Sequence, residues 1–352
     1  MDISQALFKT FTDMNIISSI TSTLFIILLG FFLRKKNIFS DQFGKMMTKI
    51  VLSVSLPALA FNSFMAPIDD QTLKHGLAVL IFGILIYIIL IFVSKLFYLG
   101  YDHDRQTVLS VLTTFGSTTF FGMPIVAAIY GPKGTMYASI FNIGYRIFLY
   151  SYAYIVMSGL KMTKKNIRQM FLNPVVLATF LGLILWIIQP YMPTLTRLNP
   201  ETHKAVTVAF YRIDVTAPWL FKPLTYLASL SSPLAWLAIG STLGEISFKS
   251  AAKNKTSWYY TAIKTIVVPA INLALLFVLT VTKILPVSQV AMATILIMMA
   301  TPTAAVAASY AIGFDREAVL TSNASFISTI GAVIMVPIWI VIISLIGSAG
   351  IF

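Results

Sequence analysis

The side chains best suited to bind a ligand lie on one face of an apolar run at residues 134–158. Arg146 stands in the middle of this run. If the run crosses a bilayer, a charge at that depth costs about 2.5–3.5 kcal/mol on insertion scales and normally faces a partner or a cavity. Asn142 and Tyr150 lie one helical turn before and after it. A planar guanidinium binds a carboxylate through two parallel hydrogen bonds, so we predict noncovalent binding of an organic anion. The alternative is an arginine that the carbonyls of a broken helix satisfy.

Hydroxyl-bearing residues, glycines and prolines interrupt two other apolar runs. Thr-Thr-Phe-Gly-Ser-Thr-Thr-Phe-Phe-Gly-Met-Pro occupies residues 113–124, and Met-Ala-Thr-Pro-Thr-Ala occupies residues 299–304. Each proline leaves the carbonyl four residues before it without a helical partner, and Pro124 is expected to push Met123 out of α geometry. Paired interruptions in two halves of a membrane chain indicate a transporter's substrate site, although each could also be a packing kink. The predicted substrate-binding residues are therefore Ser117, Thr118, Pro124, Asn142, Arg146, Tyr150, Thr301, Pro302 and Thr303.

The composition indicates the kind of protein that positions these residues. The chain has 58% hydrophobic and 11% charged residues, which excludes an ordinary soluble domain with about 25% charged residues. We predict an all-α polytopic membrane protein with ten transmembrane helices. The apolar runs are 15–33, 44–65, 75–99, 106–130, 134–158, 172–191, 222–244, 257–282, 287–312 and 317–346. The net charge of +13 comes mainly from loops beside these runs, which favours contact with a lipid bilayer rather than nucleic acid. No cofactor or metal site is indicated.

Lysine and arginine are distributed unevenly between two sets of loops. The connections after odd-numbered runs hold most of them, so these connections are predicted to be cytoplasmic and both termini extracellular. Five runs in each half then require two inverted repeats, over residues 1–171 and 172–352. The segments Ser-Leu-Pro at 55–57 and Ser-Ser-Pro at 231–233 are one weak internal match. We also expect a short amphipathic helix over residues 201–214, in the long external connection.

One further basic residue, Lys264, lies inside an apolar run. It is about two turns from the cytoplasmic end of its run, so its ammonium is expected to snorkel to the headgroups. All acidic residues and histidines lie in loops or at the ends of runs. A cation/proton antiporter, which needs an acid within the membrane, is therefore not expected. Coupling could still use exchange, a protonated substrate or sodium held by carbonyls and hydroxyls. An enzyme is not predicted, and serine chemistry with Lys264 as base is a minor alternative.

Five motifs together resemble a known family. They are Leu-Phe-Ile-Ile-Leu-Leu-Gly-Phe-Phe-Leu-Arg-Lys-Lys at 24–36, Ser-Leu-Pro-Ala-Leu at 55–59, Phe-Gly-Met-Pro at 121–124, Ile-Gly-Ser-Thr-Leu at 239–243 and Ala-Thr-Pro-Thr-Ala at 300–304. This set is similar to the auxin efflux carrier family and, within it, to the bacterial malate or malonate permease branch. The resemblance implies two inverted five-helix repeats with broken helices 4 and 9 crossing beside the site, and it allows a homodimer. Met123 and Thr301 precede the prolines where the plant members have asparagine, so an indole-acid substrate is not expected.

These observations favour a secondary carrier of organic anions. Cationic charge without a membrane carboxylate suits malate or a similar dicarboxylate, and interrupted helices suit alternating access across the cytoplasmic membrane. An anion channel and a non-transporting membrane receptor are the alternatives that the sequence leaves open.

Overall fold

The computed structural model describes residues 14–40, 42–159, 172–200, 203–245, 251–285 and 287–348. These residues are predominantly helical, with one two-stranded hairpin. The elements of the first half are α2 (Met14–Lys35), α3 (Phe43–Ile50), η1 (Val51–Ser55), α4 (Leu56–Ser63), α5 (Asp70–Leu96), α6 (His103–Thr114), η2 (Thr118–Gly122), α7 (Met123–Phe148), η3 (Leu149–Ala153) and α8 (Tyr154–Ser158). Those of the second half are α10 (Pro174–Ile188), η4 (Gln189–Tyr191), β1 (Thr194–Leu198), β2 (Ala205–Ala209), α11 (Ile213–Thr216), α12 (Pro218–Ser229), α13 (Ser231–Glu245), α15 (Lys255–Ala262), η5 (Ile263–Val267), α16 (Val268–Val281), α17 (Gln289–Met299), α18 (Ala305–Gly313) and α19 (Ala318–Ser348).

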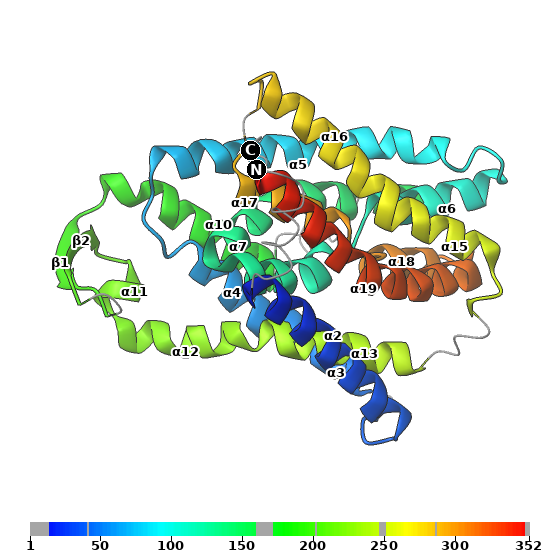
Figure 1. Cartoon of the computed structure of the whole chain (residues 1–352), viewed down its shortest axis with the longest axis horizontal. Helices are drawn as coiled ribbons and strands as arrows, with labels where there is room; N and C mark the ends of the chain where they lie inside the picture. The colour runs from blue at the N-terminus through cyan, green and yellow to red at the C-terminus, as the bar shows by residue number, and fades with distance from the viewer. Residues whose placement is uncertain are drawn as a thin grey trace.

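The helices pack in two groups, each of which contains elements from both halves of the chain (Figure 1). In the first group, α2 and α3 pack along α13, while α10 and α12 pack against α4. The α2–α13 contact is close because it has glycine on both sides: a Cβ on Gly30 would lie 2.5 Å from the Leu237 carbonyl oxygen, and one on Gly240 would overlap the Ile27 carbonyl oxygen. Small residues of this kind let two membrane helices approach backbone to backbone.

The second group contains the interrupted helices. Here α5 packs against α6 and α7, α17 packs against α7, and both α15 and α18 pack against α19. Its core is formed by fully buried aliphatic and aromatic side chains, including Phe82, Leu112, Phe141 and Leu296. Helices from residues 1–171 and from residues 172–352 thus surround the same core. Their relation as inverted repeats stays a prediction.

Where the structure describes them, the predicted apolar runs coincide with helices, although α7 continues across the boundary between runs 106–130 and 134–158, with a kink at Gly131. Within the described residues, six helical stretches are long and apolar enough to cross a membrane. They are Phe43–Ser63, Asp70–Leu96, Pro174–Tyr191, Pro218–Gly244, Lys255–Val281 and Ala318–Gly347. A polytopic helical membrane protein is therefore confirmed, whereas the number of ten crossings stays a prediction. The interrupted runs give shorter pieces, of 12 residues in α6, 11 in α17 and 9 in α18.

The helix predicted over residues 201–214 is wrong where the structure describes that segment. Thr194–Leu198 and Ala205–Ala209 form an antiparallel hairpin instead. Both segments place threonine or valine in alternation with other residues, a period that suits a strand. Figure 1 shows this hairpin at one end of the molecule, while the turn between α5 and α6 lies at the other end. The predicted extracellular termini lie outside the described residues.

Candidate functional site

The two interruptions are short extended segments that meet each other. Helix α6 ends at Thr114, and the chain becomes helical again at the π-helical turn η2, which begins at Thr118. Helix α17 ends at Met299, and α18 begins at Ala305. We call the two non-helical segments, residues 115–117 and 300–304, the crossover.

Backbone hydrogen bonds join the two segments of the crossover. Gly116 and Thr303 form an antiparallel bridge. The Ser117 amide donates to the Pro302 carbonyl at 2.7 Å, and the Ala304 amide donates to the Phe115 carbonyl at 3.1 Å. Backbone groups released from a helix at membrane depth must find partners. Each interruption therefore supplies the partners that the other needs, which explains why the two occur together.

Side chains satisfy other groups that the second interruption releases. The Thr301 hydroxyl donates to the carbonyl of Met298 at 2.7 Å, which is the carbonyl left without a helical partner by Pro302. The Thr303 amide donates to Ser328 Oγ at 3.2 Å, and the Thr303 hydroxyl lies 2.9 Å from the same atom. These hydrogen bonds hold the second segment in its extended conformation.

The two prolines have different positions. Pro302 lies within the crossover, whereas Pro124 lies in the first turn of α7. The prediction that Met123 leaves α geometry is wrong, because its φ and ψ are −57° and −44°. The π-helical turn η2 leads directly into α7, and its wider turn accommodates the N–H that Pro124 lacks. The first interruption is instead centred on Gly116, and the Pro124 carbonyl accepts a hydrogen bond from Ser232 at 2.9 Å.

The crossover is linked to the arginine face of α7. The Thr118 hydroxyl donates to Asn142 Oδ1 at 2.6 Å, and both side chains are fully buried. The amide nitrogen of Asn142 is buried and has no hydrogen-bond partner among the described residues. The structure therefore places an open hydrogen-bond donor of α7 beside the crossover.

Arg146 lies one turn beyond Asn142 and is only 6% exposed. Within the described part of the chain, its guanidinium forms no ion pair and no hydrogen bond. The side chains whose charge interacts with it are those of Tyr145 and Tyr150. Most of the predicted site residues lie at the crossover or next to it along the chain, whereas Pro124 lies in α7 beside Ser232. Ser117, Thr118, Asn142 and residues 301–303 meet at the crossover, and Arg146 and Tyr150 continue along α7 and η3.

Lys264 does not snorkel, so that prediction is wrong. Its side chain is fully buried, and Nζ donates to the Thr113 carbonyl at 2.8 Å. One turn earlier, Tyr260 is also fully buried, with its hydroxyl 3.0 Å from the Leu112 carbonyl and 2.7 Å from the Thr303 hydroxyl. Sequence reasoning missed both residues at the site. Their spacing of four residues, which matches that of Asn142 and Arg146, was a signal that could have found them.

Aromatic rings cover one side of the first segment. Phe115 stacks on Tyr87 with ring centroids 5.7 Å apart, and it meets Tyr145 edge to face at 6.1 Å. The Tyr87 hydroxyl points to the Met299 sulfur, 3.8 Å away. Because aromatic faces exclude water, the polar groups of the crossover lie in an apolar enclosure where hydrogen bonds and charges act strongly.

A cavity of about 770 Å³ opens next to this region. Its lining includes Asn62, Pro132, Asn199, Lys222 and Ser232. None of the nine predicted site residues lines it. Ser232, however, contacts both the cavity and the Pro124 carbonyl. The cavity therefore reaches the helix that follows the first interruption, and it does so from the side of the hairpin.

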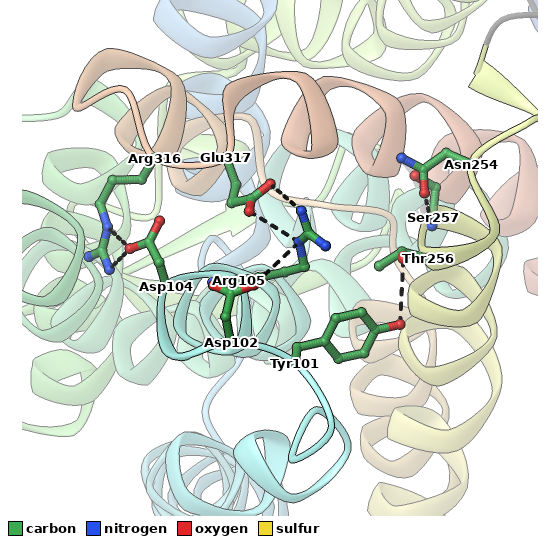
Figure 2. A network of polar contacts seen from close by, with 9 residues as sticks. All are labelled: Tyr101, Asp102, Asp104, Arg105, Asn254, Thr256, Ser257, Arg316 and Glu317. Atoms are coloured by element: carbon green, nitrogen blue, oxygen red, sulfur yellow. Dashed lines mark hydrogen bonds and ion pairs between the residues drawn. The ribbon is translucent and has the colours of Figure 1, made fainter.

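Ion pairs tie the opposite end of the interrupted helices together (Figure 2). Arg105 Nε lies 3.1 Å from Glu317 Oε1, and Arg316 Nε donates to Asp104 at 2.6 Å. Asp102 caps α6 by accepting the Arg105 amide at 3.1 Å, and this hydrogen bond lowers the pKa of Asp102 below its usual value. The start of α6 is thereby fixed to the turn between α18 and α19.

We expect replacement of Gly116 with alanine to open the crossover. A Cβ there would overlap the Thr301 hydroxyl and lie 3.0 Å from Lys264 Nζ. Overpacking of this kind costs about 1–3 kcal/mol, so the unfolding midpoint should fall by several degrees and transport should fall with it. Gly100→Ala is the control, because no heavy atom lies within 4 Å of its new Cβ. Wild-type unfolding and uptake by Gly116→Ala would show that the close approach is dispensable.

The arrangement offers binding chemistry. Among the described residues, no group of three or more histidine, aspartate or glutamate side chains could hold a metal ion. The groups that converge are hydroxyls, backbone dipoles, a carboxamide and two buried cationic side chains, which suits a noncovalently bound anion.

Comparisons with known proteins place the chain among membrane transporters. A family model described as "Membrane transport protein" matches residues 15–340. An "Uncharacterized transporter" of Methanothermobacter thermautotrophicus is 22% identical over 333 residues, which cover 92% of this chain and 97% of that protein. A second "Uncharacterized transporter", from Methanocaldococcus jannaschii, is 20% identical over 235 residues, or 64% of this chain and 68% of that protein. The resemblance to auxin efflux carriers is thus confirmed at the level of the family, and the chain belongs to the membrane transport protein family.

Proposed function

We propose that this protein is a secondary carrier that moves small organic anions, malate or a similar dicarboxylate, across the cytoplasmic membrane by alternating access. The observation that carries the proposal is Arg146, a buried charge that forms no ion pair with any described acidic residue and lies one turn from the Asn142–Thr118 contact. A buried charge without a partner is costly. An anionic substrate would supply the missing partner.

Two further features support alternating access. The cavity opens toward the hairpin end of the molecule, while ion pairs close the α6–α18 end. The two interrupted helical segments meet at the crossover, between the cavity and these ion pairs. A carrier that exposes its site to one side at a time needs a cavity on one side and a closed barrier on the other. We further propose that the hairpin end is extracellular, together with both termini.

The test uses purified protein in proteoliposomes with a panel of labelled mono-, di- and tricarboxylates. Saturable uptake of a dicarboxylate, accelerated by the same unlabelled anion on the other side, is expected for a carrier. Flux that does not saturate and is not accelerated would indicate an anion channel. Binding without flux would indicate a receptor. Imposed sodium, proton and voltage gradients, applied one at a time, identify the driving force.

A further inference from the structure

We propose that the ammonium of Lys264 is a tethered cation that occupies a monovalent-cation site at the carbonyl end of α6. The proposal concerns a site distinct from the anion-binding arginine. It holds whichever anion is carried.

The Lys264 ammonium lies at the C-terminal end of α6. A helix carries partial negative charge at its C-terminus, where the last carbonyls have no helical partner. Helix α6 ends inside the protein at Thr114. Two of its last carbonyls accept hydrogen bonds from side chains of the neighbouring segment α15–η5. The Tyr260 hydroxyl donates to the Leu112 carbonyl at 3.0 Å, and Lys264 Nζ donates to the Thr113 carbonyl at 2.8 Å. Lys264 thus supplies the positive charge, and Tyr260 a neutral hydrogen bond.

The charge of the buried Lys264 ammonium must also be balanced. An ammonium that is fully buried must be compensated, because an isolated buried charge is very unfavourable. Among the described residues, Lys264 forms no ion pair with an acid, and its hydrogen-bond partner is the Thr113 carbonyl. The negative end of α6 is therefore its compensating group. In transporters with interrupted helices, such helix ends and unwound carbonyls coordinate sodium or a proton.

The surroundings of Lys264 fix it in place. Lys264 lies in the π-helical turn η5, and Trp339 donates to the carbonyl of the next residue, Thr265, at 2.8 Å. Helix α15, which precedes η5, is held to the end of α5 by a 2.8 Å bond from Tyr259 to the Phe97 carbonyl. Tyr101 also reaches Thr256 at 3.5 Å (Figure 2). The ammonium is presented to α6 by a rigid support.

If the Lys264 side chain is removed, the site should accept a small free cation. Shortening Lys264 to alanine leaves a gap lined by the Thr113 carbonyl and the Thr301 hydroxyl, which both lie near Gly116. Methylammonium replaces the missing end of the side chain, and ammonium or sodium replaces its charge. The wild-type protein needs none of these ions at this site.

The experiment measures thermal unfolding of the purified, detergent-solubilised full chain by tryptophan fluorescence. Wild type, Lys264→Ala, Lys264→Met and Tyr260→Phe are compared in choline, sodium, ammonium and methylammonium chloride at equal ionic strength. In choline, both Lys264 variants should unfold about 5 °C or more below wild type, because a charged hydrogen bond is lost. Methylammonium should recover about half of that loss in Lys264→Ala by binding the folded state. Lys264→Met, whose side chain fills the gap, should not respond.

Tyr260→Phe is the matched control, since it removes the neighbouring bond to α6 without removing a charge. It should be destabilised but insensitive to the cation. Equal recovery of Tyr260→Phe, or no recovery of Lys264→Ala by any of the three cations, would overturn the proposal. If Lys264→Ala yields no folded protein, Lys264→Met decides alone: an unfolding midpoint equal to wild type would show that the charge is not required. No transported anion enters the assay, so the result is independent of the proposed carrier function.

Discussion

Replacing Pro302 with alanine is expected to reduce transport at least about tenfold, whereas the same change at Pro124 should leave it within about threefold. The reason is that Pro302 lies in the crossover and Pro124 lies in the first turn of α7. Alanine at 302 adds an N–H that can bond the Met298 carbonyl, which the Thr301 hydroxyl now occupies. Helix α17 could then continue toward α18.

The relative energies favour that continuation. Alanine is about 3 kcal/mol more favourable than proline in a helix interior. The two backbone hydrogen bonds across the crossover contribute about 0.5–1.5 kcal/mol each. A continuous helix would withdraw the Pro302 carbonyl from the Ser117 amide, which is 2.7 Å away in the native crossover. The gain in helix propensity is at least comparable with the bonds that would be lost.

Initial uptake rates and circular dichroism of the two single variants check this prediction. Pro302→Ala should keep its membrane insertion and gain helical signal, while Pro124→Ala serves as the matched control for the substitution itself. Equal loss of transport in both variants would mean that the position of the interruption does not matter. Unchanged transport in Pro302→Ala would mean that the crossover withstands the loss of its proline.

The helices of the fold follow from the sequence because apolar runs and their flanking charges are local signals. The crossover itself was also predictable as a region, since glycine, proline and threonine collect there. Its exact position was not. Gly116 and Pro124 both disfavour a helix within one short stretch. The interruption lies at Gly116 because residues 115–117 form backbone hydrogen bonds with residues 302–304.

Two other features depended on tertiary structure. The depth of Lys264 along its run suggested that it could reach the headgroups, but depth does not tell which way a side chain points. The structure directs it to the carbonyl end of α6, which carries partial negative charge. The hairpin at residues 194–209 was missed because Thr194–Leu198 is exposed along its whole length, so no buried face imposes the regular alternation of apolar and polar residues that marks a half-buried strand.

The second large effect is expected from substitutions of Arg146. Arg146→Gln should weaken anion binding roughly ten- to a hundredfold, because a charged hydrogen-bond partner contributes about 1.5–3 kcal/mol. Arg146→Lys should also bind weakly, since a single ammonium cannot reproduce the planar, two-pronged contact with a carboxylate. Asn142, whose free amide nitrogen lies one turn away, should steady the bound carboxylate, so Asn142→Ala should lose a smaller part of the affinity. Equilibrium binding of a labelled dicarboxylate to detergent-purified protein measures all three.

A structural arginine would also abolish binding, by unfolding the protein, so each variant is first compared with wild type by its unfolding midpoint. The two interpretations then separate. If Arg146 binds substrate, removing its uncompensated buried charge should leave the ligand-free protein as stable as wild type or more stable, because an unpaired charge in the interior is unfavourable. If carbonyls of an interrupted helix hold the guanidinium, the variant should be less stable without any ligand. A folded Arg146→Gln variant that binds the anion within about twofold of wild type would place the carboxylate site elsewhere, and the buried Lys264 ammonium at the crossover would become the group to test next.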